Sequence, residues 1–190
     1  WLDRTSGVIV QGNRIGLNKF GQAALANKGD GILLENAQNN IIGGNTTTVR
    51  NFIAGNLNSG LTIEGNNAQN NQISGNIVGT DLSGKIPLPN RNGIRLISGA
   101  SHNQIGGLQA EDGNVIVFNR MSGIDLRQGS KNQVENNQIH NNDGIAIQTL
   151  LDNFFNENHI FANRLNLLQI IGGTPTVETL SFVPQGDLHT

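Results

Sequence analysis

The stretch from Gly123 to Gly144 reads GIDLRQGSKNQVENNQIHNNDG and repeats one short pattern three times within 21 residues. An apolar–polar–apolar triplet follows Gly123. Two Asn-x-apolar triplets then follow, at 132–134 and 137–139. Two-residue alternation bounded by glycine and asparagine is typical of half-buried β-strands separated by tight turns. The stretch therefore predicts one coil built from three short strands.

The unit that begins this coil recurs along the chain. A glycine followed by two apolar residues one position apart occurs at Gly31, Gly60, Gly93, Gly123 and Gly144. A longer period of 63 residues lies over this unit, because the segment Asn40–Gly44 returns as Asn103–Gly107. We therefore expect coils of two alternating types, each with its own insertion point. A unit this small cannot bury a core alone, so neighbouring units must stack.

Glycine, asparagine and β-branched residues dominate the chain, which contains 25 glycines and 30 asparagines. These residues are poor helix formers and good turn or strand formers. Asparagine tolerates the left-handed conformation that sharp corners between strands require, so we expect it in that conformation before each strand. Asparagines at equivalent corners can also stack, with their amides hydrogen-bonded between coils. The asparagine enrichment is thus interpreted as architectural.

Overall composition limits the function classes. A net charge of −2 gives no electrostatic case for nucleic acid, and no run of apolar residues is long enough for a transmembrane helix. Because the chain starts at Trp1, we expect a processed form or fragment whose first coil is truncated, with Trp1 opposite Glu64. The predicted division is a β-helix over 1–172 and a C-terminal extension or cap over 173–190.

One segment carries a family resemblance. Residues 76–90, NIVGTDLSGKIPLPN, lead into Gly93-Ile-Arg-Leu and then into Asn103–Gly107. This order resembles the bacterial right-handed parallel β-helix repeat family of large secreted and surface proteins, over about residues 7–164. The resemblance implies an all-β solenoid of six to seven coils with three short strands each, at a bacterial cell surface or outside the cell. It is weak for function, because the same repeats serve adhesins, lyases and epimerases.

The strand after each recurring glycine suggests a surface site. Residues one and three positions after the glycine should face the core, and those two and four positions after it should face outward. By this register Ala146 and Gln148 face outward in the fifth unit. Five charged residues should form one mixed patch across four neighbouring coils: Glu35, Glu64, Arg95, Asp125 and Arg127.

Two interpretations of this patch remain open. As a glycan site, Arg95 or Arg127 would neutralise a uronate while Glu64 or Asp125 assisted proton abstraction. As a structural feature, the patch would be a ladder of opposite charges on adjacent strands. We favour the second, because no Asp-Pro-His motif and no trio of acids placed for calcium accompanies the patch. The five residues are kept as glycan-binding candidates, and no residue is assigned to catalysis.

The favoured function is a structural or adhesive segment of an extracellular protein that binds polysaccharide or associates with itself, end to end or side by side. The alternative is a polysaccharide lyase or uronate epimerase acting on the same face. No cofactor, metal, nucleic acid or membrane insertion is expected. His102, His140 and His159 lie beside asparagine-rich corners without a carboxylate at ligand spacing, so they do not predict a metal site.

Overall fold

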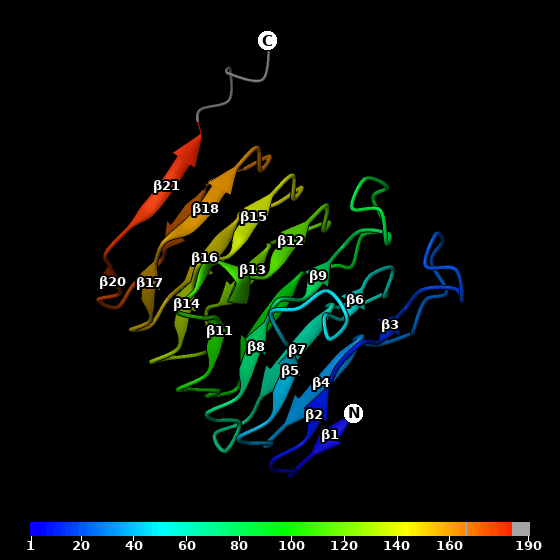
Figure 1. The fold of residues 1–190 in the computed structure, drawn as a ribbon. Coiled ribbons are helices and arrows are strands. Elements are labelled where there is room, and N and C mark those ends of the chain that lie inside the picture. The colour runs from blue at the N-terminus through cyan, green and yellow to red at the C-terminus, as the bar shows by residue number, and fades with distance from the viewer. Residues whose placement is uncertain (166, 184–190) are drawn as a thin grey trace.

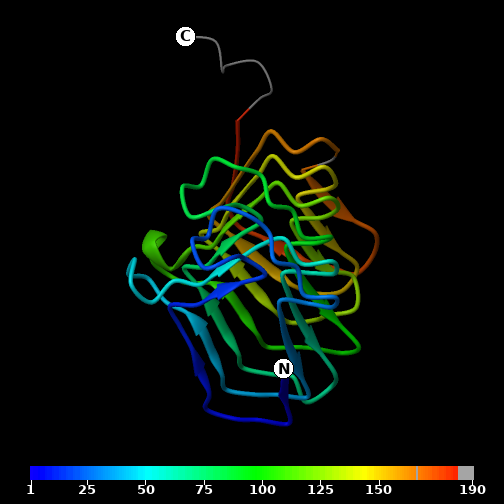
Figure 2. The same cartoon turned by 90° about the vertical axis from the view of Figure 1, so that its right-hand side faces the viewer.

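The computed structural model describes residues 1–165 and 167–183, and almost all of its regular structure is β-strand. The described residues contain one 3₁₀ turn, Ala110–Asp112, and 21 strands of two to four residues. These strands form three parallel sheets of seven strands each. Each coil contributes one strand to each sheet in turn, so seven coils stack from β1 at one end to β21 at the other (Figure 1 and Figure 2). The chain is a right-handed parallel β-helix, as the repeats predicted.

The strands of the three sheets are short and evenly spaced. Sheet 1 contains β1 (Leu2–Asp3), β4 (Ile32–Glu35), β7 (Leu61–Glu64), β10 (Ile94–Ile97), β13 (Ile124–Leu126), β16 (Ile147–Thr149) and β19 (Leu168–Ile170). Sheet 2 contains β2 (Ile9–Val10), β5 (Ile41–Gly43), β8 (Gln72–Ser74), β11 (Gln104–Gly106), β14 (Gln133–Glu135), β17 (Phe154–Asn156) and β20 (Thr176–Val177). Sheet 3 contains β3 (Arg14–Ile15), β6 (Phe52–Ile53), β9 (Ile77–Val78), β12 (Val115–Val117), β15 (Gln138–His140), β18 (Asn158–Phe161) and β21 (Leu180–Val183).

Apolar side chains stack in columns inside the coils. In sheet 2, Ile42 pairs in register with Ile73, which pairs with Ile105, and all three are fully buried. In sheet 1, the residues one and three positions after each glycine are buried in the first four units, as expected. Parallel in-register stacking makes each coil bury its neighbour's apolar face, which a single coil cannot do.

Three ladders of asparagines, buried except for Asn13 and Asn27 in the first coil, occupy the three corners of the helix. They are Asn40, Asn71, Asn103, Asn132 and Asn153; Asn13, Asn51, Asn76, Asn114, Asn137 and Asn158; and Asn27, Asn56, Asn90, Asn119, Asn142 and Asn163. In a typical rung, the backbone N–H and the side-chain Nδ2 of Asn71 both donate to Oδ1 of Asn103, at 3.0 and 2.9 Å. The same Nδ2 donates to the carbonyl of Ala37 at 2.8 Å. Buried amides are thus satisfied from coil to coil, which makes the corners favourable rather than costly.

The expected backbone conformation of these asparagines is wrong. The left-handed conformation falls on the residue before the ladder asparagine, as at Asn39 (φ 54°), Asn70 (φ 55°) and His102 (φ 57°). The ladder residue must aim its own N–H and its side chain along the helix axis toward the next coil. The sharp turn of the corner is therefore made one residue earlier.

The two-coil alternation is confirmed by the positions of the long loops. Coils 1 and 3 carry loops 16–31 and 79–93 between sheet 3 and sheet 1, and coils 2 and 4 carry loops 44–51 and 107–114 between sheet 2 and sheet 3 (Figure 1). Loops of one type contact each other across the intervening coil. Leu82 N–H donates to the Gly21 carbonyl at 3.1 Å, and Asn45 Nδ2 donates to Asp112 Oδ1 at 3.1 Å.

Two register predictions are wrong. Asp3, not Trp1, lies in the row of Glu35 and Glu64. In the fifth glycine unit, Ile124 pairs with Ile147 rather than with Ile145, so Ala146 is buried instead of facing outward.

The reason for the second error is that, in this unit, the ladder asparagine keeps its spacing to the strand and the glycine does not. Ile124 lies five residues after Asn119, and Ile147 lies five residues after Asn142. Gly144 falls two residues too early to mark the same position as Gly123.

The C-terminal segment continues two of the sheets. β20 pairs with β17, and β21 pairs with β18, both in parallel. The division at residue 172 stays a prediction, and residues 184–190 of the expected extension lie outside the described residues.

Candidate functional site

The outward face of sheet 1 divides four of the five predicted residues between two rows, and Arg127 directly follows β13. Arg95 lies in register between Thr62 on β7 and Asp125 on β13. Glu64 lies in register between Glu35 on β4 and Ile97 on β10. The sheet therefore brings Arg95 and Asp125 together and places both glutamates in a different row from Arg95.

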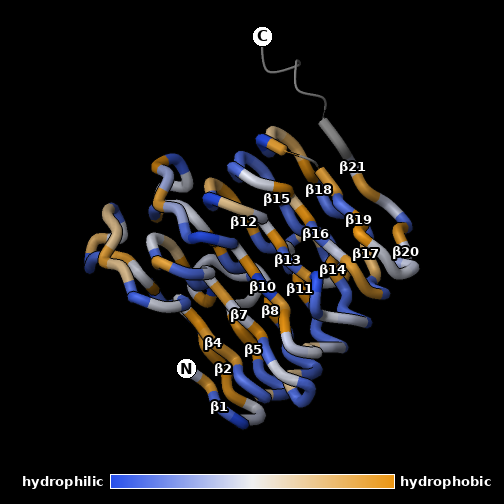
Figure 3. Tube along the Cα trace, turned by 180° about the vertical axis from the view of Figure 1, so that it is seen from behind, coloured by the Kyte–Doolittle hydropathy of each residue, from blue (hydrophilic) through white to orange (hydrophobic). Residues whose placement is uncertain are grey.

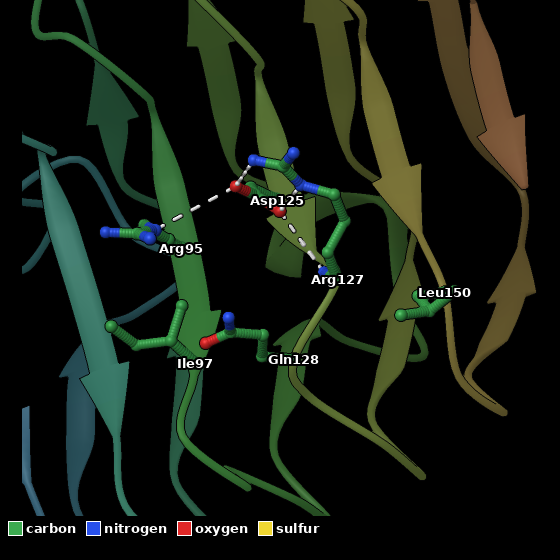
Figure 4. A pocket seen from close by; sticks show the side chains of 6 residues that line it. All are labelled: Arg95, Ile97, Asp125, Arg127, Gln128 and Leu150. Atoms are coloured by element: carbon green, nitrogen blue, oxygen red, sulfur yellow. Dashed lines mark hydrogen bonds and ion pairs between the residues drawn. The ribbon is translucent and has the colours of Figure 1, made fainter. Parts of the chain in front are cut away.

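Asp125, Arg95 and Arg127 form a compact cluster, which we call the arginine–aspartate cluster. Asp125 is 3% exposed, and Arg127 donates to its carboxylate from Nε at 2.9 Å and from Nη2 at 2.8 Å. The backbone N–H of Arg127 adds a third contact at 3.2 Å. Arg95 approaches from the neighbouring strand, with its Nε 3.8 Å from Asp125 Oδ2 (Figure 4). One buried carboxylate thus faces two guanidinium groups.

The cluster has a clear electrostatic character. The hydrogen bond to Asp125 raises the pKa of Arg127, against the opposing effect of burial, so the guanidinium stays charged. Arg95 Nε is buried without a hydrogen-bond partner among the residues the structure describes. Two positive charges against one negative charge leave the cluster with a net charge of +1, and Asp125 has its carboxylate occupied by donors.

A surface hollow of about 280 Å³ lies over this cluster (Figure 4). It is lined by Arg95, Ile97, Asp125, Arg127, Gln128 and Leu150. A smaller hollow of about 80 Å³ adjoins it. That hollow shares the three clustered residues and adds Arg91, Asn92 and Met121. The lining of both combines cationic and aliphatic side chains and contains no aromatic ring.

Asp30 is a further candidate that the sequence reasoning missed. It immediately precedes Gly31, and its Oδ1 accepts the backbone N–H of Ser59 at 2.9 Å. Burial raises the pKa of Asp30, and the Ser59 N–H, the Thr62 side chain and the charge of Arg95 oppose that rise. The Thr62 hydroxyl is buried without a hydrogen-bond partner within the described part of the chain.

The only signal for Asp30 in the sequence is the residue type before the recurring glycine. Gly60, Gly93 and Gly123 are preceded by serine or asparagine, whereas an aspartate precedes Gly31 and also Gly144, the glycine that is out of register. The charge of Arg95 also acts on this carboxyl group. A group of this kind can exchange protons with a bound molecule.

Glu35 and Glu64 belong to an acidic row at the N-terminal end of sheet 1. Asp3, Glu35 and Glu64 lie in register on three consecutive strands. Glu35 accepts a hydrogen bond from Trp1 Nε1 at 3.1 Å. No arginine or lysine forms an ion pair with Glu35 or Glu64 among the described residues. The mixed patch is therefore a basic group on β10 and β13 next to an acidic row on β1, β4 and β7.

The other titratable residues have local structural contacts. Burial and the nearby His159 lower the pKa of His140 to about 4, and its ring stacks on Phe161 with centroids 4.2 Å apart. Burial alone would raise the pKa of Asp81, but hydrogen bonds from Ile86, Ser83 and Lys85 within its own loop hold it at about 2. Within residues 1–165 and 167–183, no group of three His, Cys, Asp or Glu side chains is placed to hold a metal ion.

Comparison with known proteins agrees with this architecture. The family model described as the right-handed β-helix region matches residues 84–179, half of the chain. No curated protein and no solved structure matched the chain. No described helix is long and apolar enough to cross a membrane. The matched segment covers the coils that carry the arginine–aspartate cluster, and the chain belongs to the right-handed β-helix family.

Proposed function

We propose that the chain is a rigid structural and adhesive segment of an extracellular bacterial protein, and that its arginine–aspartate cluster binds an acidic polysaccharide. The rigidity follows from three asparagine ladders that link each coil to the next by buried hydrogen bonds. A stack held along its whole length suits a stalk or surface scaffold. Adhesion requires a ligand-binding feature on the outside of that stack.

The observation that carries the glycan proposal is the charge balance of the cluster. Asp125 holds Arg127 in place through a bidentate contact, and Arg95 adds a second guanidinium beside it. Guanidinium groups bind carboxylates well because their planar N–H donors match the two oxygens. A uronate carboxylate in the hollow of about 280 Å³ would meet a net positive surface.

The same geometry argues against Asp125 as a catalytic base. Arg127 makes three hydrogen bonds to its carboxylate, and a second arginine lies nearby. These donors occupy the oxygens that would take a proton from a substrate. The binding role therefore needs fewer assumptions than the lyase or epimerase role at this position.

Titration of the protein with polygalacturonate and alginate, followed by isothermal calorimetry, tests the proposal. We expect binding that weakens as salt rises, and no binding to a neutral glucan. The double variant Arg95→Gln/Arg127→Gln should lose binding at least tenfold. Arg4→Gln is the matched control, because Arg4 is exposed and lies in the first coil. Uronate binding that survives the double variant unchanged would refute the glycan role.

A second candidate function, lyase or epimerase chemistry, has one observation in its favour. Asp30 is a half-buried carboxyl group with a raised pKa, and the charge of Arg95 acts on it. Abstraction of a proton next to a uronate carboxylate needs a base and a nearby cation. Incubation with the same polysaccharides, followed by the ultraviolet absorbance of unsaturated products, distinguishes cleavage from binding. Activity lost in Asp30→Asn would favour the enzyme over the adhesive module.

A further inference from the structure

The corner between sheet 3 and sheet 1 differs in charge from the rest of the molecule. We call it the basic edge, and its described segments are 16–31, 54–60, 79–93, 118–123, 141–146, 162–165 and 167. Six of the twelve basic residues of the chain lie on it, all exposed: Lys19, Lys28, Lys85, Arg91, Arg120 and Arg164. The edge contains three acidic residues, and one of them, Asp81, is buried within its own loop. The edge is therefore positive on a chain whose net charge is −2.

Exposed apolar side chains gather on the same edge. Six large ones lie there: Phe20, Leu25, Leu57, Ile86, Met121 and Leu165. Phe20 is 61% exposed and Leu25 is 70% exposed, at the outer part of the 16–31 loop. Figure 3 shows hydrophobic colour along this loop, away from the body of the helix. An apolar group with interspersed positive charges marks an interaction surface rather than an ordinary solvated corner.

The loops hold these side chains in place. Asn18 Oδ1 accepts the backbone N–H groups of Phe20 and Gln22 at 3.2 and 3.1 Å, which fixes the turn that presents Phe20. Lys19 Nζ lies 4.8 Å from the centre of the Phe20 ring, so charge and aromatic surface are side by side. The Leu82–Gly21 hydrogen bond joins the 79–93 loop to this one. Preorganised side chains lose little conformational freedom when they bind.

The segments also form one continuous surface. Arg91 N–H donates to the Asn58 carbonyl at 2.8 Å, and Met121 N–H donates to the Arg91 carbonyl at 2.7 Å. Basic and apolar side chains from successive coils thus follow one another along the helix axis. A flat surface that is both apolar and anionic would contact several coils at once.

We propose that the basic edge docks the protein onto an anionic lipid surface. Phe20, Leu25 and Ile86 would enter the headgroup–acyl boundary, while the lysines and arginines contact acidic headgroups. Peripheral binding of this kind depends on buried apolar area together with attraction to anionic lipids. A soluble polyanion would bind the lysines and arginines of the edge but would leave its apolar side chains exposed to water. The acidic row of a second copy offers the exposed Trp1 beside Glu35 as an apolar partner, whereas a lipid surface would cover all six apolar side chains of the edge.

Vesicle co-sedimentation tests this proposal with the whole chain. We expect binding to vesicles of phosphatidylcholine mixed with phosphatidylglycerol, little binding to phosphatidylcholine alone, and weaker binding as salt rises. The double variant Phe20→Ser/Leu25→Ser should bind the anionic vesicles at least tenfold more weakly. Lys85→Gln should weaken binding about fivefold.

Matched controls lie on other faces of the β-helix. Leu108→Ser changes a side chain that is 75% exposed on the 107–114 loop, and Lys131→Gln removes an exposed lysine between sheet 1 and sheet 2. Both should bind like the unchanged protein, as should Arg95→Gln/Arg127→Gln, so the result is independent of the glycan proposal. Failure to bind anionic vesicles, or equal losses in the controls, would overturn the lipid role. Self-association in light scattering that Phe20→Ser/Leu25→Ser abolishes, without vesicle binding, would assign the edge to a second copy instead.

Discussion

The interior corners of the coils and the outer face of sheet 1 differ in how closely residue type repeats from coil to coil. Each corner repeats the same buried asparagine from coil to coil, whereas the outer row of sheet 1 changes residue type at almost every strand. In that row Thr62, Arg95, Asp125 and Gln148 lie in register. This difference indicates that coil stacking constrains the residue type only where groups form hydrogen bonds along the helix axis. Side chains that point outward are free to form a local site on an otherwise uniform scaffold.

This contrast has an energetic basis. A ladder asparagine forms hydrogen bonds to the coils on both sides, so one change affects two coils. A residue on the outer face contacts at most its neighbours on adjacent strands, and solvent screens its charge. We therefore expect interior changes to alter stability and outer changes to alter binding.

The sharpest test compares two adjacent residues of β10. Ile94 is fully buried, so Ile94→Asp should place an unpaired charge in the core and destabilise the fold by more than about 4 kcal/mol. Arg95→Ala should change stability by less than about 1 kcal/mol, because Arg127 still pairs with Asp125. Urea unfolding followed by circular dichroism measures both. Equal effects for the two variants would mean that the register of sheet 1 is wrong.

The ladder itself is tested at its centre. Asn103→Ala removes the oxygen that accepts two hydrogen bonds from Asn71 and leaves both donors buried. We expect a loss of about 3 kcal/mol in the free energy of unfolding. Asn67→Ala, at an exposed asparagine in the equivalent turn of the preceding coil, should cost less than about 0.5 kcal/mol. A ladder that contributes nothing would give the two variants the same midpoint in urea.

A third test concerns the C-terminal coils, where His140 lies in register between Val117 on β12 and Phe161 on β18. Its pKa in the folded protein is lowered to about 4, so the folded state binds fewer protons than the unfolded state between about pH 4 and 6.5. Stability should therefore fall on acidification through that window, by about 1–2 kcal/mol because the half-exposed ring is partly screened.

The variant His140→Phe keeps the ring stacked on Phe161 and should remove most of this pH dependence. Denaturant midpoints measured at several pH values between 4 and 7 provide the check. His102→Gln serves as the control, because His102 is exposed. If the free energy of unfolding of His140→Phe still depended on pH as steeply as that of the unchanged protein, groups other than His140 would cause the acid sensitivity.

The fold could be predicted from the sequence because its determinants are repeated. Apolar alternation predicted the strands, the 63-residue period predicted the two loop types, and the asparagines predicted the corners. The register failed at Gly144, which lies two residues after Asn142, whereas Gly123 lies four residues after Asn119. Asn142 determines the register there because two buried hydrogen bonds hold it in place, whereas Gly144 only permits a turn.

The site could be predicted only in part, because it is not repeated. Alternation correctly placed Arg95 and Asp125 on one face, but pairwise contact depends on which residue lies opposite in the next coil. Glu64 lies opposite Ile97 rather than Arg95, because Arg95 is in register with Thr62, two positions before Glu64 on β7. Asp30 lies in a loop end, where no period indicates which way a side chain points.

Asp30 gives the last test, and the smallest expected effect on stability. Because burial raises its pKa, the folded state disfavours the charged carboxylate, so this contribution destabilises the fold as pH rises above the unfolded value of 3.8. Asp30→Asn keeps an oxygen for the Ser59 N–H and removes the charge. The variant should therefore be slightly more stable than the unchanged protein at pH 7, with the difference fading near pH 3. If Asp30→Asn were less stable than the unchanged protein at neutral pH, the negative charge of Asp30 would stabilise the fold through its attraction to Arg95.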